Sequence, residues 1–219
     1  MVDVEYLVSP LGMTVLRTHL VRAHSRLTVW VNQEGAELVD QGFGMVVRAS
    51  RPVVAERATY IASSAGQFEA GETSVGVPTT AQDWYFAEGV SGPAFDTYLL
   101  LANPSESAAE VIPVNAEYDW APQTGFGMHL HVTNGVEVRV TLGFEDGGTP
   151  ISADVTVAAG RRVTVDVGTL FPTAMNRRFS ARVESLNAAP ILVEQSMYWS
   201  HGTGVWKTGV SLPATPLQP

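Results

Sequence analysis

The sequence predicts an all-β protein built from antiparallel β-sandwiches arranged in tandem, and two observations support this class. Apolar and polar residues alternate with period two through many short segments, and turn residues separate these segments about every 8–12 residues. A motif also recurs, because residues 52–61 (PVVAERATYI) resemble residues 190–199 (PILVEQSMYW). Such self-similarity is typical of a structural unit that occurs more than once in a chain.

The similarity extends on both sides of this motif. Upstream, residues 22–31 match residues 158–167 at an offset of 136. Downstream, residues 74–80 match residues 209–215 at an offset of 135. Small changes of offset are what loop-length differences between two copies would produce, so we interpret the chain as an internal repeat.

These matches define the expected domains. We expect residues 1–78 to be the later part of a first β-sandwich repeat, residues 79–83 to be a linker, and residues 84–219 to be a complete second repeat. The second repeat carries an insertion near residues 112–135 that the first copy does not match. No segment like WYFAEG (84–89) or YLLLANP (98–104) precedes Val2, so we expect the first copy to lack its opening strands, which predicts an open sheet edge and exposed apolar surface. Either residues 111–132 or a second chain could fill this gap.

In the first copy, alternation predicts strands at residues 2–6, 14–21, 26–31, 43–49, 52–61 and 74–77. One helical turn is expected around residues 36–39. In the second copy, strands are expected at residues 84–89, 97–104, 136–144, 151–157, 162–167, 178–185, 191–199 and 210–212, with 111–118 and 128–132 as further candidates.

Three local signals refine this pattern. Residues 97–104 (TYLLLANP) form an apolar run, which predicts a central strand buried on both faces. Asn134-Gly135 between alternating segments predicts a type I′ hairpin turn. Helical periodicity nowhere exceeds one turn, and residues 170–175 are the only candidate for a helix. We therefore expect tandem immunoglobulin-like sandwiches, the first of them truncated at its N-terminal side.

Composition restricts the partners. The net charge is −9 and the isoelectric point is about 4.9, so neither a nucleic acid nor insertion into a membrane is expected. The chain has no cysteine, which excludes disulfides and thiolate metal sites. No signal sequence opens the chain as given, and no run of about 18 apolar residues occurs.

Catalytic and metal-binding patterns are weak. His129 and His131 lie two residues apart on one predicted strand and could offer two ligands to Zn²⁺, but no third ligand is indicated. Glu88 and Glu194 could be imagined as a carboxylate pair for glycoside cleavage, yet Glu194 recurs among core residues. No G-x-S-x-G motif is present. We expect no enzyme activity and no cofactor.

Several recurring residues indicate structural roles. Glu56 and Glu194 occupy matching positions on faces that also carry Tyr60 and Tyr198, so we expect both carboxylates to be partly buried and paired. The shared arginines Arg26 and Arg162 are the expected partners, and Trp84, on an apolar strand, is expected in the core.

Exposed aromatic residues offer an alternative function. Trp206, in the loop HGTGVWKTG, is the least constrained tryptophan, and His201 and Tyr85 could lie near it. Because aromatic rings stack on sugar faces, these residues would form the binding surface of a carbohydrate-binding module. The alternative interpretation is that such large aromatics belong to the core.

The segments DWYFAEG, FDTYLLLANPSESAAEV, VTVAAGRRVTVDV and PILVEQSMYW together resemble a repeated β-sandwich family of exported and surface-attached bacterial proteins, a domain of unknown function. The resemblance covers residues 83–213 as one full unit and residues 1–78 as part of another. It implies a non-catalytic structural or interaction module that acts as a spacer, scaffold or self-assembly unit outside the cell. The partners it implies are a second copy, through oligomerisation or strand complementation, another protein or a cell-surface polysaccharide.

Overall fold

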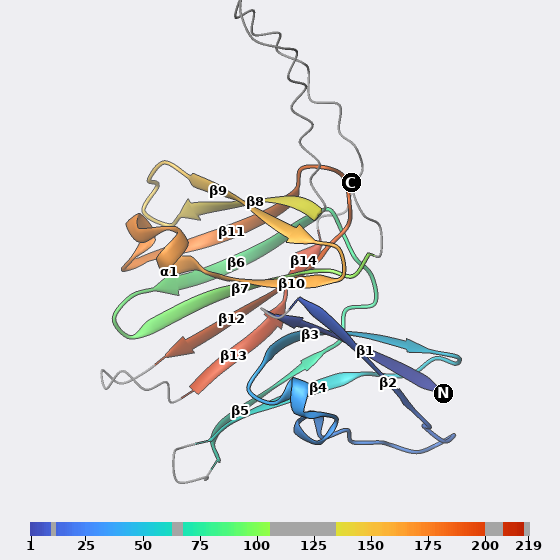
Figure 1. The fold of residues 1–219 in the computed structure, drawn as a ribbon. Coiled ribbons are helices and arrows are strands. Elements are labelled where there is room, and N and C mark those ends of the chain that lie inside the picture. The colour runs from blue at the N-terminus through green and yellow to red at the C-terminus, as the bar shows by residue number, and fades with distance from the viewer. Residues whose placement is uncertain (10–11, 63–67, 106–134, 200–207, 217–219) are drawn as a thin grey trace, which may run out of the picture.

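The computed structural model of residues 1–219 consists mainly of antiparallel strands, which confirms the all-β class (Figure 1). It describes the whole chain except residues 10–11, 63–67, 106–134, 200–207 and 217–219. The strands are β1 (Val2–Ser9), β2 (Met13–His19), β3 (Gly42–Ala49), β4 (Glu56–Ala62), β5 (Phe68–Val75), β6 (Asp83–Ser91), β7 (Phe95–Asn103), β8 (Gly135–Phe144), β9 (Ile151–Ala158), β10 (Arg161–Asp166), β11 (Arg177–Ser185), β12 (Leu192–Trp199), β13 (Thr208–Pro213) and β14 (Thr215–Pro216). The short helices are η1 (Val31–Gln33), η2 (Ala36–Leu38), α1 (Val167–Leu170) and η3 (Pro172–Ala174). In the described part of the chain, no helix has the length and apolar character needed to cross a membrane.

Strands β6–β14 form two antiparallel sheets that enclose the larger core. One sheet has the order β10-β7-β12-β13 and the other has the order β14-β6-β11-β8-β9. Leu99 and Leu101 of the first sheet and Val138 and Val140 of the second are fully buried between them, together with Trp84. Full burial of each such aliphatic side chain contributes about 1.5–3 kcal/mol, so this core supplies most of the stability of the region.

Strand β7 is central in its sheet, as predicted, but only one of its faces is fully buried. Leu99 and Leu101 point into the core, whereas Tyr98, Leu100 and Ala102 are half-buried on the opposite face. The apolar run at residues 97–104 thus contains alternate side chains in two environments, one inside the core and one on the outer face of the sheet. The core covers one side, and β3 approaches the other, where a Cβ on Gly44 would lie 3.7 Å from the Ala102 Cβ.

The N-terminal part contains a three-stranded sheet of order β2-β1-β3 and the β4–β5 hairpin. Alternate β1 residues Val2, Val4, Tyr6 and Val8 are buried in a small second core with Leu38. The Tyr6 ring also meets the Phe43 ring edge-on, with 5.5 Å between centroids. This core is far smaller than the one between the two larger sheets.

The three-stranded sheet has the same pairing register as a part of the five-stranded sheet. Val2 pairs with Ala49 across β1 and β3, and Val138 pairs with Ser185 across β8 and β11, 136 positions later for both partners. The β1–β2 and β8–β9 ladders share this offset. A slip of one residue would reverse which side chains face the core, so a common register gives both sheets the same inward face.

The two hairpins β4–β5 and β12–β13 also share a register. Tyr60 pairs with Gly71, and Tyr198 pairs with Gly209, an offset of 138 for both partners. In each pair the tyrosine ring lies where a Cβ on the glycine would be. The offset of 135 predicted for residues 74–80 is therefore wrong, because the ladder keeps the offset of the preceding strand.

Two turns have matching conformations as well. His24 and Gly160 both have positive φ, at 54° and 61°, and they lie 136 positions apart. Asp40 and Asn176 repeat the offset at 57° and 62°. Positive φ is uncommon outside glycine and is tolerated best by residues such as Asn, Asp and His. The chain thus reverses in the same way at corresponding places.

The expected strand at residues 26–31 is absent, although the matching residues form β10. The ladder partner of β10 is β7, and no strand takes the place of β7 among the described residues of 1–78. A segment without a partner cannot satisfy its backbone groups in a sheet, so Trp30 lies 64% exposed. The motif strand also begins later than predicted, at Glu56. The candidate strands 111–118 and 128–132 and the Asn134 turn lie outside the described residues.

Trp84 provides a test of where the main core lies. Its side chain is fully buried, and its indole N–H donates to the carbonyls of Ala81 at 3.1 Å and Ile191 at 3.2 Å. Trp84→Ala should lower the free energy of unfolding in urea by about 3–5 kcal/mol, because it leaves a large cavity. Trp30→Ala, at an exposed position, should change it by about 0.5 kcal/mol or less. Equal effects of the two substitutions would contradict the packing described.

Candidate functional site

The β4–β5 hairpin docks on the outer face of β12 and β13 through a partly buried ion pair. Arg57 of β4 donates two hydrogen bonds to the carboxylate of Glu194 on β12, one of them from Nη1 to Oε2 at 3.1 Å. The Arg57 side chain is only 25% exposed, and the Glu194 side chain is only 22% exposed. A two-point contact between guanidinium and carboxylate fixes orientation as well as distance, so it locks the hairpin onto the sheet.

A chain of hydroxyl contacts extends this interface. Glu72 of β5 accepts a hydrogen bond from Ser211 of β13 at 2.7 Å, and the Ser211 and Ser196 hydroxyls lie 2.5 Å apart. Ser196 and Ser211 are buried. Strand β5 lies alongside β13 in Figure 1, as these contacts require.

The expected partners of the two recurring glutamates are wrong. Glu194 pairs with Arg57 rather than Arg162, because the docked hairpin brings Arg57 to the outer face of β12. Glu56 is exposed rather than partly buried. Arg26 is also exposed, and its guanidinium donates to Thr28 at 3.4 Å, because residues 26–31 do not join a sheet.

Arg162 instead fills a second contact between the N-terminal and C-terminal parts. Its side chain crosses the β3 residues Gly42 and Gly44, where a Cβ on Gly44 would lie 3.4 Å from the Arg162 Cδ. Burial lowers the pKa of Arg162, while the nearby Glu194 carboxylate acts in the opposite direction. The two glycines thus leave room for a long cationic side chain between two sheets.

Beside this interface lies an open hollow of about 260 Å³ on the outer face of the four-stranded sheet. The Tyr98 and Tyr198 rings lie edge to face in it, with 6.0 Å between centroids. Burial raises the pKa of Tyr98 to about 12, and the Asp96 carboxylate adds to the shift. The lining residues are Tyr98, Leu100, Arg162, Thr164, Ser196 and Tyr198.

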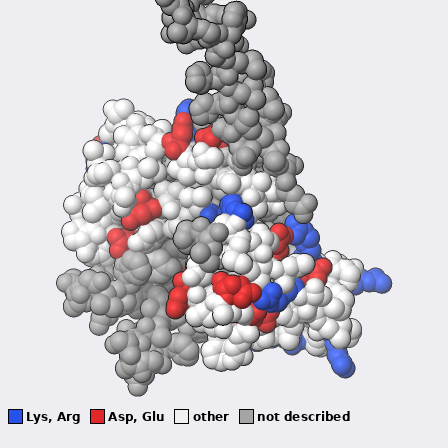
Figure 2. Space-filling view, viewed as in Figure 1, with Lys and Arg blue, Asp and Glu red and all other residues white. Residues whose placement is uncertain are grey.

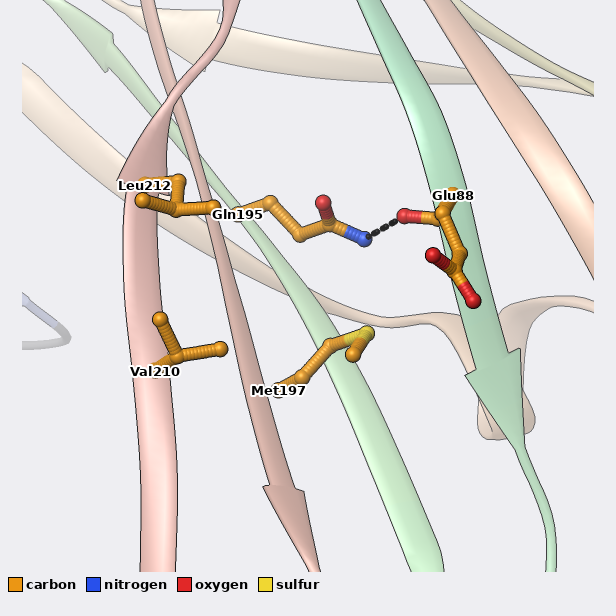
Figure 3. A pocket seen from close by; sticks show the side chains of 5 residues that line it. All are labelled: Glu88, Gln195, Met197, Val210 and Leu212. Carbon is orange, nitrogen blue, oxygen red and sulfur yellow. Dashed lines mark hydrogen bonds between the residues drawn. The ribbon is translucent and has the colours of Figure 1, made fainter.

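A smaller hollow of about 110 Å³ lies between the two large sheets, where β6 faces β12 and β13 (Figure 3). Gln195 donates from Nε2 to the backbone carbonyl of Glu88 at 2.8 Å across this opening, and Met197 and Val210 supply apolar walls. Glu194, next to Gln195 on β12, points to the opposite face and binds Arg57. This arrangement contradicts the carboxylate pair imagined from Glu88 and Glu194.

The edge of β3 that faces away from β1 is the third notable feature. In the five-stranded sheet, β11 pairs with β8 on one side and with β6 on the other. β3 pairs with β1, and no described strand pairs with its other side. As a result Val47 is 39% exposed, whereas Val183, at the same register position on β11, is fully buried.

The residues predicted as a binding surface fall into two groups. Tyr85 is 40% exposed on β6, where Thr215 of β14 pairs with it. Trp206 and His201 lie outside the described residues, as do the metal candidates His129 and His131. Among the residues that the structure does describe, no cluster of three or more His, Asp or Glu side chains is arranged to hold a metal ion.

The other predicted structural residues occupy different environments. Trp84 is fully buried, as expected. Tyr198 is half-buried in the larger hollow, whereas Tyr60 is 63% exposed. Corresponding tyrosines thus differ because only the hairpin containing Tyr198 lies within a larger sheet.

Surface charges of both signs are mixed over the N-terminal part. Figure 2 shows most of the visible Lys and Arg atoms there, next to Asp and Glu atoms. Two pairs explain part of this pattern: Arg17 bonds to Glu37 at 2.6 Å, and Arg48 bonds to Glu5 at 2.5 Å. Water screens charge pairs of this kind, so they affect solubility more than stability.

The comparisons with known proteins yield distant structural similarity only. No protein-family model and no curated protein matches the sequence. The chain is similar to a crystal structure of Thermotoga maritima 1070, with a TM-score of 0.45 and 14% identity over 64% of this chain and 97% of that one. It is also similar to the Anabaena sensory rhodopsin transducer, with a TM-score of 0.35 and 18% identity over 55% of this chain and 86% of that one.

Arg57 and Glu72, the hairpin residues that make the polar interface, are absent from the residues predicted from the sequence. A signal was present, because the register offset of 138 matches Arg57 to Gln195 and Glu72 to Val210. Gln195 and Val210 lie on the face of β12–β13 that turns toward the core, and the residues at the same register positions in β4–β5 are charged. Charged residues at positions that face a core in the similar hairpin indicate that this face of β4–β5 packs against a polar surface instead.

The pKa of Tyr98 predicts a dependence of stability on pH. The Tyr98 phenol has an ordinary pKa of about 10, and folding raises it. The protonated phenol therefore contributes its full share to the free energy of unfolding below about pH 10. This contribution is lost as the pH rises toward 12, when the unfolded chain releases the proton first. Tyr98→Phe should therefore flatten the decline of the unfolding free energy between about pH 10 and 11.5, measured by urea denaturation. Equal slopes for the two proteins would refute the assignment.

Proposed function

We propose that this chain is a non-catalytic structural module of an exported or cell-surface bacterial protein. In this proposal, β6–β14 form a complete immunoglobulin-like sandwich repeat, and residues 1–78 are a shorter copy docked against it. The observation that carries the proposal is the common pairing register, offset by 136 in one sheet and by 138 in one hairpin. Independent folds would have no reason to share both the ladders and the positive-φ turns.

The interface supports a rigid spacer or scaffold rather than two loosely linked units. Arg57 and Glu194 fix the hairpin to β12, Ser211 binds Glu72, and Arg162 lies across the glycines of β3. These contacts come from three separate strands of the N-terminal part. Contacts spread in this way resist rotation about the short connection at residues 79–83, so both parts hold one orientation.

The rigidity of this module can be measured by ¹⁵N relaxation. We expect one rotational correlation time for the amides of residues 1–78 and of residues 79–219, because the interface couples them. Different correlation times for the two parts would contradict a rigid spacer. A sedimentation measurement under the same conditions establishes whether the tumbling particle is a monomer.

The Arg57–Glu194 pair should contribute most of this coupling. Arg57→Ala should lower the free energy of unfolding by about 1.5–3 kcal/mol, because it leaves a partly buried carboxylate without its charged partner. The matched control is Arg139→Ala, which removes an exposed bidentate pair with Asp154 and should have a clearly smaller effect, because water screens exposed charges. An Arg57→Ala effect no larger than that of the control would show that the pair does not hold the hairpin in place.

Carbohydrate binding is the competing proposal, and Tyr85 supports it by offering an aromatic ring that is 40% exposed. A glycan array separates the two functions. A spacer gives no signal, whereas a carbohydrate-binding module gives a signal that Tyr85→Ala or Trp206→Ala abolishes.

A further inference from the structure

The edge of β3 with which no described strand pairs corresponds to an edge that is occupied elsewhere in the same chain. β11 has the same register against β8 as β3 has against β1, and β6 completes the other side of β11. The pairing of β6 with β11 therefore shows which kind of strand can pair with the corresponding edge of β3. An exposed edge with apolar neighbours is a template for adding a strand.

The side chains near this edge remain partly uncovered. Trp84 of β6 pairs with Val183 of β11, and both are fully buried. Val47, which holds the place of Val183, is 39% exposed, and Val53, which holds the place of the buried Ile191, is 45% exposed. The uncovered surface is thus the one that a β6-type strand and its neighbours protect in the complete sandwich.

We propose that β3 is an acceptor edge for an antiparallel strand with the residue pattern of β6, supplied from outside residues 1–219. The inference rests on the proposed repeat relationship and names the partner of the module. Binding would extend the β2-β1-β3 sheet by one strand in the register that β6 uses against β11. The N-terminal part would then gain the strand that β6 supplies beside β11.

The register specifies what this strand must contain. Gly89 pairs with Phe179, whose ring fills the space of a glycine Cβ, so the added strand needs glycine opposite Phe43. It needs a large apolar residue, such as Trp84 provides for Val183, opposite Val47.

Charge favours the same pattern. Asp83 of β6 faces Glu184 of β11, a repulsive pairing that Arg182 offsets by bonding to Asp83 at 2.8 Å and 2.9 Å. The β3 residue at the position of Glu184 is Arg48, whose side chain is 54% exposed. An aspartate opposite Arg48 would therefore face a cation, shared with Glu5, rather than a carboxylate. The added strand would avoid on β3 the repulsion that Asp83 meets at Glu184 on β11.

The direct test adds a peptide with the sequence of residues 81–92, AQDWYFAEGVSG, to the full chain. We expect backbone amides of β3 to become protected from hydrogen exchange in proportion to peptide concentration. A peptide of the same composition in scrambled order should leave them unchanged. Protection by both peptides, or by neither, overturns the proposal.

A charge reversal identifies the register. Arg48→Glu should weaken binding of the peptide by roughly twofold to fivefold, and a peptide with Asp83→Lys should restore it. Arg139→Glu, on the distant β8, should leave the affinity unchanged. An effect of Arg48→Glu that the Asp83→Lys peptide does not reverse contradicts the proposed pairing.

Two further outcomes separate this inference from the proposed function. If the chain without peptide forms a dimer by sedimentation and β3 is already protected, the edge pairs with a second copy and the β6-type partner is wrong. If the peptide does not bind while residues 1–78 and 79–219 tumble together, strand addition is rejected and the rigid module remains. Loss of common tumbling rejects the module itself.

Discussion

The hydrogen-bonded ladder between β7 and β10 determines which of two similar segments becomes a strand. Residues 26–31 and 162–167 share their pattern, but only the second segment lies beside a strand with free backbone groups. A strand is stable only where a neighbour satisfies its N–H and C=O groups. This requirement explains the main differences between the two parts of the chain, including the exposed Trp30 and the open edge of β3.

The same requirement explains the polar interface. In the four-stranded sheet, β12 and β13 turn one face to a large apolar core, which contains residues such as Val193. The β4–β5 hairpin has no second sheet of its own to enclose such a core, and it carries Arg57 and Glu72 instead. These side chains meet Glu194 and Ser211 on the outside of the larger sheet. Charged residues thus stand in β4–β5 at the register positions of Gln195 and Val210, and they suit a hairpin that docks on a sheet rather than one that encloses an apolar core.

Much of the fold could be predicted because it depends on local patterns. Period-two alternation located β1, β8 and β11, and a recurring motif predicted the similar β4 and β12. What could not be predicted depends on partners distant in the chain. The strand expected at 26–31 does not form, because it has no neighbouring strand to pair with. Glu194 binds Arg57 rather than Arg162, because the local sequence of neither strand determines where the β4–β5 hairpin docks.

The shared register of the two parts is tested most directly by backbone NMR of the full chain. Interstrand NOEs should connect Val4 with Val47, and Val140 with Val183, the same pairs displaced by 136 residues. If the contacts of Val4 shift by one residue along β3 while those of Val140 do not, the two sheets present different faces to their cores. The N-terminal part would then be no copy of the sandwich, and the acceptor role of β3 would lose its basis.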